Sequence, residues 1–361
     1  MNSAAHREAW ASLSLRALPH AAMVALLRAF GAPENVLAAS RAQLSAVVPD
    51  AVVASLLAPP AQDALARTSA WLAVPGHDVV AWDDTDYPRA LLELGYAPPV
   101  LFFVGRRELL NRPALAIVGS RNATAQGLDN ARNFARALAE AGLTIVSGLA
   151  LGVDAAAHEG ALGGAGSTLA VVGTGLDRVY PARHRELAHR IADEGGLLSE
   201  FPLGTPPREK NFPRRNRLIS GLAQGVLVVE AALGSGSLIT ARYAGEQGRE
   251  VFAIPGSIHS PLAKGCHKLI REGAKLVETA QDILEELGMA VKATGSLQSA
   301  TGAPISESAL LAALADDPVD IDALVARTGL PAHAVTAELT ELELAGIVAS
   351  LPGGRWQRRR T

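Results

Sequence analysis

One short segment of the sequence combines an aromatic side chain with a cluster of cations. It reads Lys210-Asn211-Phe212-Pro213-Arg214-Arg215-Asn216-Arg217. From Thr205 to Ser220 there are five Lys or Arg and one acid, in a chain whose net charge is -3. An aromatic ring can stack on a base while neighbouring cations hold the phosphates, which is the minimum for binding a single nucleic-acid strand. Taken alone, such a run is more often a solvated charged surface with the ring folded inward.

Glycines and hydroxyl residues follow several short apolar runs. The loops are Gly119-Ser120-Arg121, Ser147-Gly148-Leu149-Ala150, Gly173-Thr174-Gly175, Glu230-Ala231-Ala232-Leu233-Gly234-Ser235-Gly236-Ser237 and Pro255-Gly256-Ser257. A glycine lets the backbone approach a ligand closely, and the helix after each loop would point its free N–H groups at an anion. Further donors are the hydroxyls of Ser120, Ser147, Thr174, Ser237 and Thr240. One such loop is explained by the needs of a tight turn, but five together predict an anion-binding groove.

The sequence does not specify a compact nucleotide pocket. The dinucleotide fingerprint G-x-G-x-x-G is absent after the first of these apolar runs, and Gly173-x-Gly175 stands alone. The triphosphate motif G-x-x-x-x-G-K-[ST] is also absent. A groove of loops beside the Lys210 to Arg217 segment favours a longer phosphodiester chain as the ligand.

Candidates for catalysis or metal binding are few. Asp154 and His158 are four residues apart on one expected helix, and could be a base with its orienter or two metal ligands. No third ligand or nucleophile accompanies them, which favours a capping and packing role. Glu230 could be an acid or base, or could pair with Arg242 or Arg249. We therefore predict no catalytic residue, no metal and no cofactor.

Composition predicts a cytoplasmic protein without membrane association. Of the 361 residues, 49% are hydrophobic and 19% charged, which is enough for a sizeable core. The single cysteine, Cys266, allows no intramolecular disulfide and fits a reducing cytosol; we interpret it as buried filler in preference to a nucleophile. There is neither a signal-like N-terminus nor a long uncharged apolar run. Because the net charge is near zero, any contact with nucleic acid must be a local patch.

The central part of the chain must position these loops. Between residues 114 and 278, short apolar runs alternate with helix patterns, at residues 114–118, 143–146, 168–172, 197–198, 226–229, 251–254 and 275–277. Such alternation predicts an α/β fold, with a mainly parallel, doubly wound sheet covered on both faces. Its crossovers are right-handed, so the carboxyl ends of the strands, and the loops after them, meet at one edge of the sheet.

Two smaller modules flank this core. Residues 1–75 have helical spacing in short segments, with Ser40 as one cap, and predict a helical module of the SAM or helix-hairpin-helix kind. Two strands at residues 79–82 and 100–104 join it to the core, which spans 76–287. A polar linker at 288–304 leads to a winged helix-turn-helix at 305–361. Its expected reading helix, Ala332–Leu344, carries three Glu and no Lys or Arg, which favours docking to protein over duplex DNA.

A long ordered set of motifs resembles the DNA-processing protein A family (DprA, also called Smf). The motifs are Gly119-Ser120-Arg121, Ser147-Gly148-Leu149-Ala150-x-Gly152-x-Asp154-x-x-x-His158, Gly173-x-Gly175-x-Asp177-x-x-Tyr180-Pro181, Phe212-Pro213-x-Arg215-Asn216-Arg217-x-Ile219-Ser220-Gly221-Leu222 and Pro255-Gly256. The resemblance implies an extended Rossmann-like core, without known catalysis, that binds single-stranded DNA and forms a homodimer. It also implies help in loading RecA onto incoming strands during natural transformation, together with single-strand-binding protein.

The resemblance also implies roles for particular residues. Arg121 is similar to the family's phosphate-contacting arginine, and Phe212, Arg215 and Arg217 fall in its DNA-binding segment, with Lys210 at a variable basic position before them. The expected DNA-binding set is completed by the loop residues Gly119, Ser120, Ser147, Gly148, Gly173, Ser237 and Thr240. Where the family usually has Gly-x-Asn, this chain has Gly265-Cys266-His267, so the local contact at His267 differs.

Two other functions remain as alternatives. A nucleotide-processing enzyme on a lysine-decarboxylase-like Rossmann fold would carry P-G-G-x-G-T-x-x-E, whereas the nearest string, from Gly234 to Thr240, lacks the Pro-Gly-Gly and the Glu. A transcription factor would use the winged module, whose acidic helix is unsuited to duplex phosphates.

Overall fold

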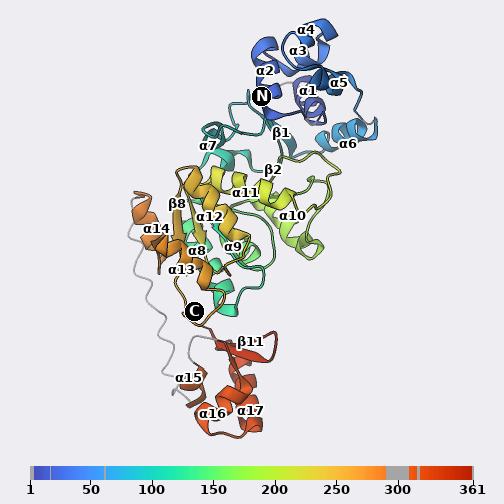
Figure 1. Ribbon diagram of the computed structural model, residues 1–361. Coiled ribbons are helices and arrows are strands. Elements are labelled where there is room, and N and C mark those ends of the chain that lie inside the picture. The colour runs from blue at the N-terminus through green and yellow to red at the C-terminus, as the bar shows by residue number, and fades with distance from the viewer. Residues whose placement is uncertain (1–3, 17, 61, 290–308, 315–317, 360–361) are drawn as a thin grey trace.

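The chain forms three modules in a row, seen in a computed structural model that describes residues 4–16, 18–60, 62–289, 309–314 and 318–359. The N-terminal module (blue) and the C-terminal module (red) lie at opposite ends of the α/β core (Figure 1). Most of the predicted linker, 290–304, lies outside the described residues.

The core is built on one nine-stranded sheet, and its mainly parallel α/β class is as predicted. The order of the strands in the sheet is β1-β2-β6-β5-β4-β3-β7-β8-β9. The seven neighbours from β6 to β9 in this order are parallel to one another. β2 pairs antiparallel with both β6 and β1. The strands are β1 (His77–Ala81), β2 (Val100–Gly105), β3 (Ala114–Val118), β4 (Thr144–Ser147), β5 (Thr168–Val171), β6 (Gly196–Ser199), β7 (Gly225–Val228), β8 (Glu250–Ala253) and β9 (Lys275–Leu276). Each lies at or within a few residues of an apolar run in the sequence.

Helices cover both faces of this sheet, because the strands are apolar on both sides. One face carries α8 (Ala125–Glu140), α9 (Val153–Ala161), α10 (Arg185–Glu194) and α14 (Ala280–Glu286). The other carries α7 (Arg89–Leu92), α11 (Asn211–Leu222), α12 (Ser237–Glu246) and α13 (Lys264–Arg271). Short 3-10 turns lie at η1 (Arg107–Asn111) and η2 (Ala182–His184).

The strand order reverses at β3. This strand lies between β4 and β7. The strands that follow β3 in the chain are added first on its β4 side, as β4, β5 and β6, and then on its β7 side, as β7, β8 and β9. Ligands of open α/β sheets bind outside the carboxyl ends of the strands at such a switch point. The loops at 119–124 and 230–236 meet there.

The N-terminal module packs onto the antiparallel edge of the sheet. Its helices are α1 (Ala4–Ser14), α2 (His20–Phe30), α3 (Pro33–Ala38), α4 (Arg41–Ser45), α5 (Asp50–Leu57) and α6 (Gln62–Leu72). Ser40 caps α4 in a capping box with Gln43, as predicted. Trp71 contacts Phe102 of β2, with ring centroids 5.9 Å apart, so the module shares a core with the first two strands.

The C-terminal module has its own core and the predicted winged helix-turn-helix order. It contains α15 (Ala309–Leu314), β10 (Val319–Asp320), α16 (Ile321–Thr328), α17 (Ala332–Leu344), β11 (Val348–Leu351) and β12 (Arg355–Arg358). Asp320 caps α16 by accepting from the N–H of Ala323 at 2.7 Å, and Gly329 ends that helix in the left-handed conformation.

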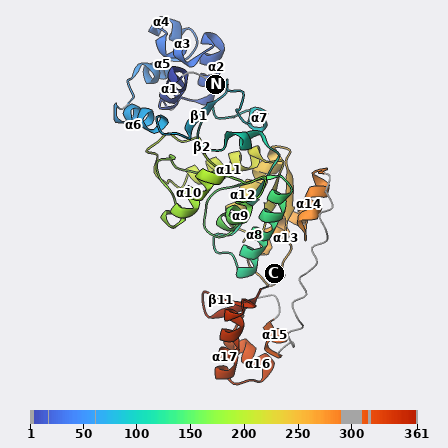
Figure 2. The same cartoon turned by 180° about the vertical axis from the view of Figure 1, so that it is seen from behind.

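The wing of this module touches the core. Arg359, directly after β12, makes a bidentate ion pair with Asp129 of α8, both contacts at 2.8 Å. The backbone N–H of Gln126 also donates to Oε1 of Gln357 at 3.3 Å. Figure 2 shows α8 on the side of the core nearest β11. Over the described ranges, no helix is long and apolar enough to cross a bilayer.

Candidate nucleic-acid interface

Phe212 lies between a second aromatic ring and a cation. Its ring centroid is 5.6 Å from that of Tyr180, and the guanidinium of Arg121 lies 5.8 Å from it. These distances are typical of an aromatic pair and a cation–π contact. Tyr180 is 47% exposed, Arg121 is exposed and Phe212 is half-buried. The three side chains come from three separate segments and form one apolar, positively charged surface.

The first turn of α11 holds Phe212 in this place. Pro213 is tolerated there because the first N–H groups of a helix have no partner within it. Nδ2 of Asn211 donates to the carbonyl of Gly173 at 3.0 Å. A Cβ on Gly173 would lie 3.0 Å from Cδ1 of Phe212, so the ring packs closely on the backbone of the loop after β5.

Arg121 is carried by the loop after β3. The N–H of Val153 donates to the carbonyl of Ser120 at 3.1 Å, and a Cβ on Gly152 would overlap that carbonyl. The close approach of the two loops fixes the backbone under Arg121. No carboxylate among the described residues forms an ion pair with Arg121, so its charge is available to a ligand.

Arg215 is a correction to the expected DNA-contacting set. Its residue is only 4% exposed, and Nη1 donates to the carbonyl of Val171 at 3.0 Å. A Cβ on Gly148 would overlap this guanidinium. Burial lowers the pKa of Arg215 to about 10, so it is still charged at neutral pH. In this conformation the side chain of Arg215 packs under Gly148, in the loop after β4, and bonds to the end of β5. It does not face solvent.

Asp154 balances this buried charge and holds a loop. Its Oδ2 accepts from the N–H groups of Gly148 at 3.1 Å and Ala150 at 3.3 Å. Burial raises the pKa of Asp154, and the charge of Arg215 opposes that rise. Of the capping and packing role that the sequence favoured, the packing part is confirmed: Asp154 is buried and bonds to the loop before α9, and it does not cap the helix.

His158 is also a packing residue. Oγ1 of Thr168 donates to the carbonyl of Ile145, so it accepts from Nδ1 of His158 at 2.7 Å. Nε2 then accepts from the N–H of Leu149, at 3.3 Å. Burial lowers the pKa of His158 to about 3, which keeps the ring neutral, and the two hydrogen bonds decide its tautomer.

Glu200 forms ion pairs with two other arginines of this segment, Arg214 and Arg217. It is 1% exposed in its side chain, and its Oε2 lies 2.9 Å from Nη2 of Arg214 and 2.5 Å from Nη2 of Arg217. Arg217 also donates to the carbonyl of Tyr96 at 3.1 Å and is 14% exposed in its side chain. Arg214, by contrast, is 60% exposed. Lys210, two residues before Phe212, is exposed and forms no ion pair with a described carboxylate, so its charge is available to a ligand.

Glu230 fills the helix N-terminus at the switch point. Its carboxylate accepts from the N–H of Thr124 at 2.9 Å and from Oγ1 at 2.6 Å, at the start of α8. A Cβ on Gly127 would meet the same carboxylate at 2.5 Å. Burial raises the pKa of Glu230, and the bonds from Thr124 oppose that rise. The alternative that Glu230 pairs with Arg242 or Arg249 is wrong, since these two arginines pair with Glu246 and Glu93.

Most of the predicted loop hydroxyls are used within the protein. Ser147 donates to the carbonyl of Ile117 at 2.6 Å, and Oγ of Ser120 accepts from the N–H of Asn122 at 3.1 Å. Ser237 bonds to Ser235 at 2.7 Å, and Thr240 is buried. Gly119 lies against Val153, where a Cβ would meet its side chain at 2.6 Å. These residues shape the loops, and the groove of free donors that we expected does not form in this conformation.

The single cysteine is buried filler, as interpreted from the sequence. Cys266 is fully buried, and burial raises the pKa of its thiol to about 12, so it is not a thiolate at neutral pH. The neighbouring His267 bonds through Nε2 to the carbonyl of Gly256 at 2.9 Å and so braces the Pro255–Gly256 turn.

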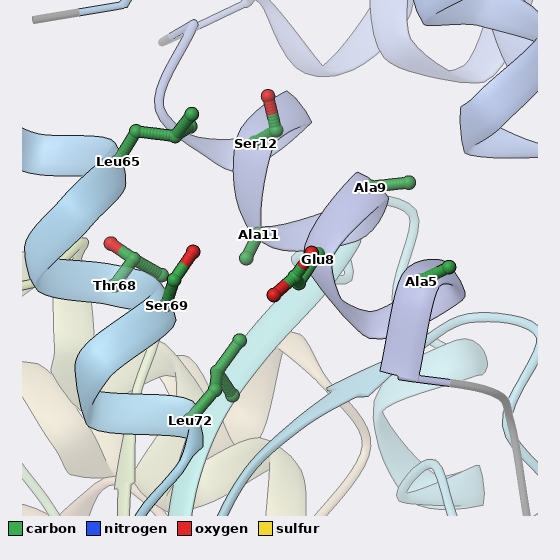
Figure 3. Close-up of a pocket in the computed structure, with 9 residues that line it drawn as sticks. All are labelled: Ala5, Glu8, Ala9, Ala11, Ser12, Leu65, Thr68, Ser69 and Leu72. Atoms are coloured by element: carbon green, nitrogen blue, oxygen red, sulfur yellow. The ribbon is translucent and has the colours of Figure 1, made fainter. Parts of the chain in front are cut away.

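A pocket of about 300 Å³ lies elsewhere, between α1 and α6. Figure 3 shows its lining side chains, which are small, apolar or hydroxyl-bearing apart from Glu8. It has no cation to hold a phosphate and is not part of this interface. Within the part of the chain that the structure describes, no group of three or more His, Cys, Asp or Glu could hold a metal ion.

Fold and site together define a Rossmann-like protein with an exposed aromatic and cationic surface at its strand ends. The chain belongs to the DNA recombination-mediator protein A family, whose model matches residues 78–288. A second model, the DprA winged helix domain, matches residues 293–354.

Individual relatives agree with this assignment. The chain is 45% identical to Protein Smf of Escherichia coli over 300 residues, 80% of each chain. It is 50% identical to DNA processing protein DprA of Streptococcus pneumoniae over 203 residues, 56% of this chain and 72% of that one. A crystal structure of the Streptococcus pneumoniae protein has a TM-score of 0.66 and 39% identity, covering 77% of this chain and 97% of that one. A structure that describes single-stranded DNA binding by DNA processing protein A of Helicobacter pylori has a TM-score of 0.53 and 32% identity, covering 58% and 95%.

Proposed function

We propose that this protein is a cytoplasmic recombination mediator that binds single-stranded DNA, protects it and helps to load RecA onto it during natural transformation. The observation that carries the DNA-binding part is the ring of Phe212 between Tyr180 and Arg121. A base can stack on this aromatic surface while Arg121 holds the adjoining phosphate. Both contacts tolerate any base, so we propose binding without sequence preference.

The wider role is supported by membership of the family. RecA, single-strand-binding protein and a second copy of this chain are the proposed partners. We also propose the division into a helical module at 1–75, a DNA-binding core at 76–287, a linker at 288–304 and a winged module at 305–361.

We further propose that the protein is not an enzyme. Two observations favour this over the nucleotide-processing alternative. The carboxylate of Glu230 occupies the place at the start of α8 where a nucleotide phosphate would bind in this fold. Asp154 and His158 are buried and committed to backbone and hydroxyl partners.

The salt dependence of binding tests the proposed site. Two exposed cations without an ion pair in the described chain lie in it, Arg121 and Lys210, so log K should fall against log salt with a slope of about -1.4 per chain. Arg121→Ala should weaken binding to all sequences alike and make this slope shallower by about 0.7. The measurement is a fluorescence titration of a labelled oligothymidylate at several salt concentrations, with a matched duplex for comparison.

Arg28→Ala is the matched control, because Arg28 is exposed on α2 in the N-terminal module, away from the site (Figure 1). It removes the same charge and should leave the slope unchanged. An affinity that does not depend on salt, or equal losses in both variants, would contradict the proposed site.

A further inference from the structure

The wing of the C-terminal module closes one side of a cleft on the core. The wing is β11, β12 and the turn between them at 352–354. The cleft has a volume of about 710 Å³, within the range of ordinary ligand pockets, about 300–1,000 Å³. Its core side comes from the loop after β3 and from residues 259–262.

This cleft begins where the proposed DNA site ends. Asn122 and Thr124 line it, and Asn122 directly follows Arg121. A strand whose base stacks on Phe212 and whose phosphate meets Arg121 therefore has the cleft next to it along the core. Continuity with the proposed site is the first reason to consider DNA as the occupant.

The chemistry of the lining is the second reason. None of the lining residues is acidic, although the chain as a whole has 36 acids against 33 Lys and Arg. Arg355 of the wing is exposed and forms no ion pair within the described residues, and His259 lines the core side of the cleft. Leu351 and Pro352 add apolar surface, which suits bases and sugars between the phosphates.

The wing is fastened in this position. Nε and Nη2 of Arg359 contact the two carboxylate oxygens of Asp129, whose side chain is largely buried. This bidentate pair raises the pKa of Arg359, and bidentate geometry also fixes orientation. Gln357, buried beside it, accepts from the N–H of Gln126. Gln357 lies on the same strand as Arg355, and Arg359 directly follows that strand, so these contacts hold the wall of the cleft that carries Arg355.

We propose that the cleft is a second subsite for the same single strand of DNA, with Arg355 of the wing as its phosphate contact. This inference rests on the proposed function, because it extends the site around Arg121 and Phe212. The module would contribute through its wing, and none of the cleft's lining residues comes from the acidic helix α17. A short DNA strand would bind to the site on the core alone, and a longer DNA strand would also reach Arg355 on the wing.

A length series tests the subsite. Labelled oligothymidylates of about 6 and about 30 nucleotides are titrated onto the full-length protein; the first is near the lower end of ordinary single-strand site sizes, about 4–16 nucleotides, and the second is above them. Arg355→Ala should weaken binding of the long strand about fivefold near 0.1 M salt, and make its salt slope shallower by about 0.7, as for one lost phosphate contact. Binding of the short strand should be unchanged, and Arg28→Ala should change neither.

A second variant examines the fastening. Arg359→Ala removes the ion pair with Asp129 and should cause the same loss for the long strand only. The double variant should lose less than the sum of the two, since both act on one contact. Thermal melts of all variants check that the protein stays folded.

The possible outcomes separate this inference from the proposed function. If Arg355→Ala binds the long strand as Arg28→Ala does, the cleft does not hold DNA, and the inference is wrong. A loss shared by short and long strands would place Arg355 in the first subsite and also overturn it. Arg121→Ala should weaken both lengths, and only its failure to do so would count against the proposed function itself.

Discussion

Asp154→Ala is expected to lower the free energy of unfolding of the core by about 3–5 kcal/mol, the usual cost of breaking a buried charge pair. The substitution leaves the guanidinium of Arg215 buried without its counter-charge. It also leaves the N–H groups of Gly148 and Ala150 without their acceptor. Thermal unfolding followed by circular dichroism measures the effect, at about 2–4 °C per kcal/mol for a domain of this size.

Two further variants separate the causes. Asp154→Asn keeps an oxygen that can accept from the same N–H groups but replaces the charge by a buried amide, so comparison with Asp154→Ala separates the lost acceptor from the lost charge. Asp193→Ala is the matched control, since Asp193 is an exposed acid on α10 with no ion pair in the described chain, and surface changes cost within about 0.5 kcal/mol. If Asp154→Ala melts like Asp193→Ala, Arg215 does not depend on this carboxylate.

Phe212→Ala is expected to weaken binding of single-stranded DNA by about 1–3 kcal/mol, the range for one stacked base. The ring is half-buried at the start of α11, so its removal should change the melting temperature much less than Asp154→Ala does. The measurement is the same fluorescence titration, with a melt of each variant beside it.

Phe212→Leu is the informative control, because leucine keeps apolar volume against Gly173 and Tyr180 but cannot stack. It should bind nearly as weakly as Phe212→Ala. Intact binding in both variants, together with a large loss of thermal stability, would show that the ring belongs to the core and not to the DNA site.

The parallel sheet could be predicted because each strand has a local apolar run and each crossover a helix pattern. The place of Arg215 could also have been found. In α11 it lies four residues after the buried Asn211 and three and four before the buried Leu218 and Ile219, so helical spacing puts it on the inner face. The helical repeat therefore separates Arg215, on the inner face, from the exposed Arg214 next to it.

Other parts of the site had no local signal. Glu230 bonds to Thr124, the N-cap of a helix that begins more than a hundred residues earlier. Glu200 pairs with Arg214 and Arg217, which lie 14 and 17 residues further along the chain. Only the folded chain brings such partners together. Tyr180 had a weaker signal, as one of few aromatics in the sequence and part of a motif, but its closeness to Phe212 depends on two loops meeting in space.

The carboxylate of Glu230 at the start of α8 has a consequence for the protein in a crowded cell. Free ATP and other metabolites are abundant anions, and an open helix N-terminus at this edge of the sheet would attract them. Because the carboxylate of Glu230 already lies at the start of α8, such metabolites have no strong binding site beside Arg121. Occupancy by DNA should then follow the supply of strands and stay insensitive to the energy state of the cell.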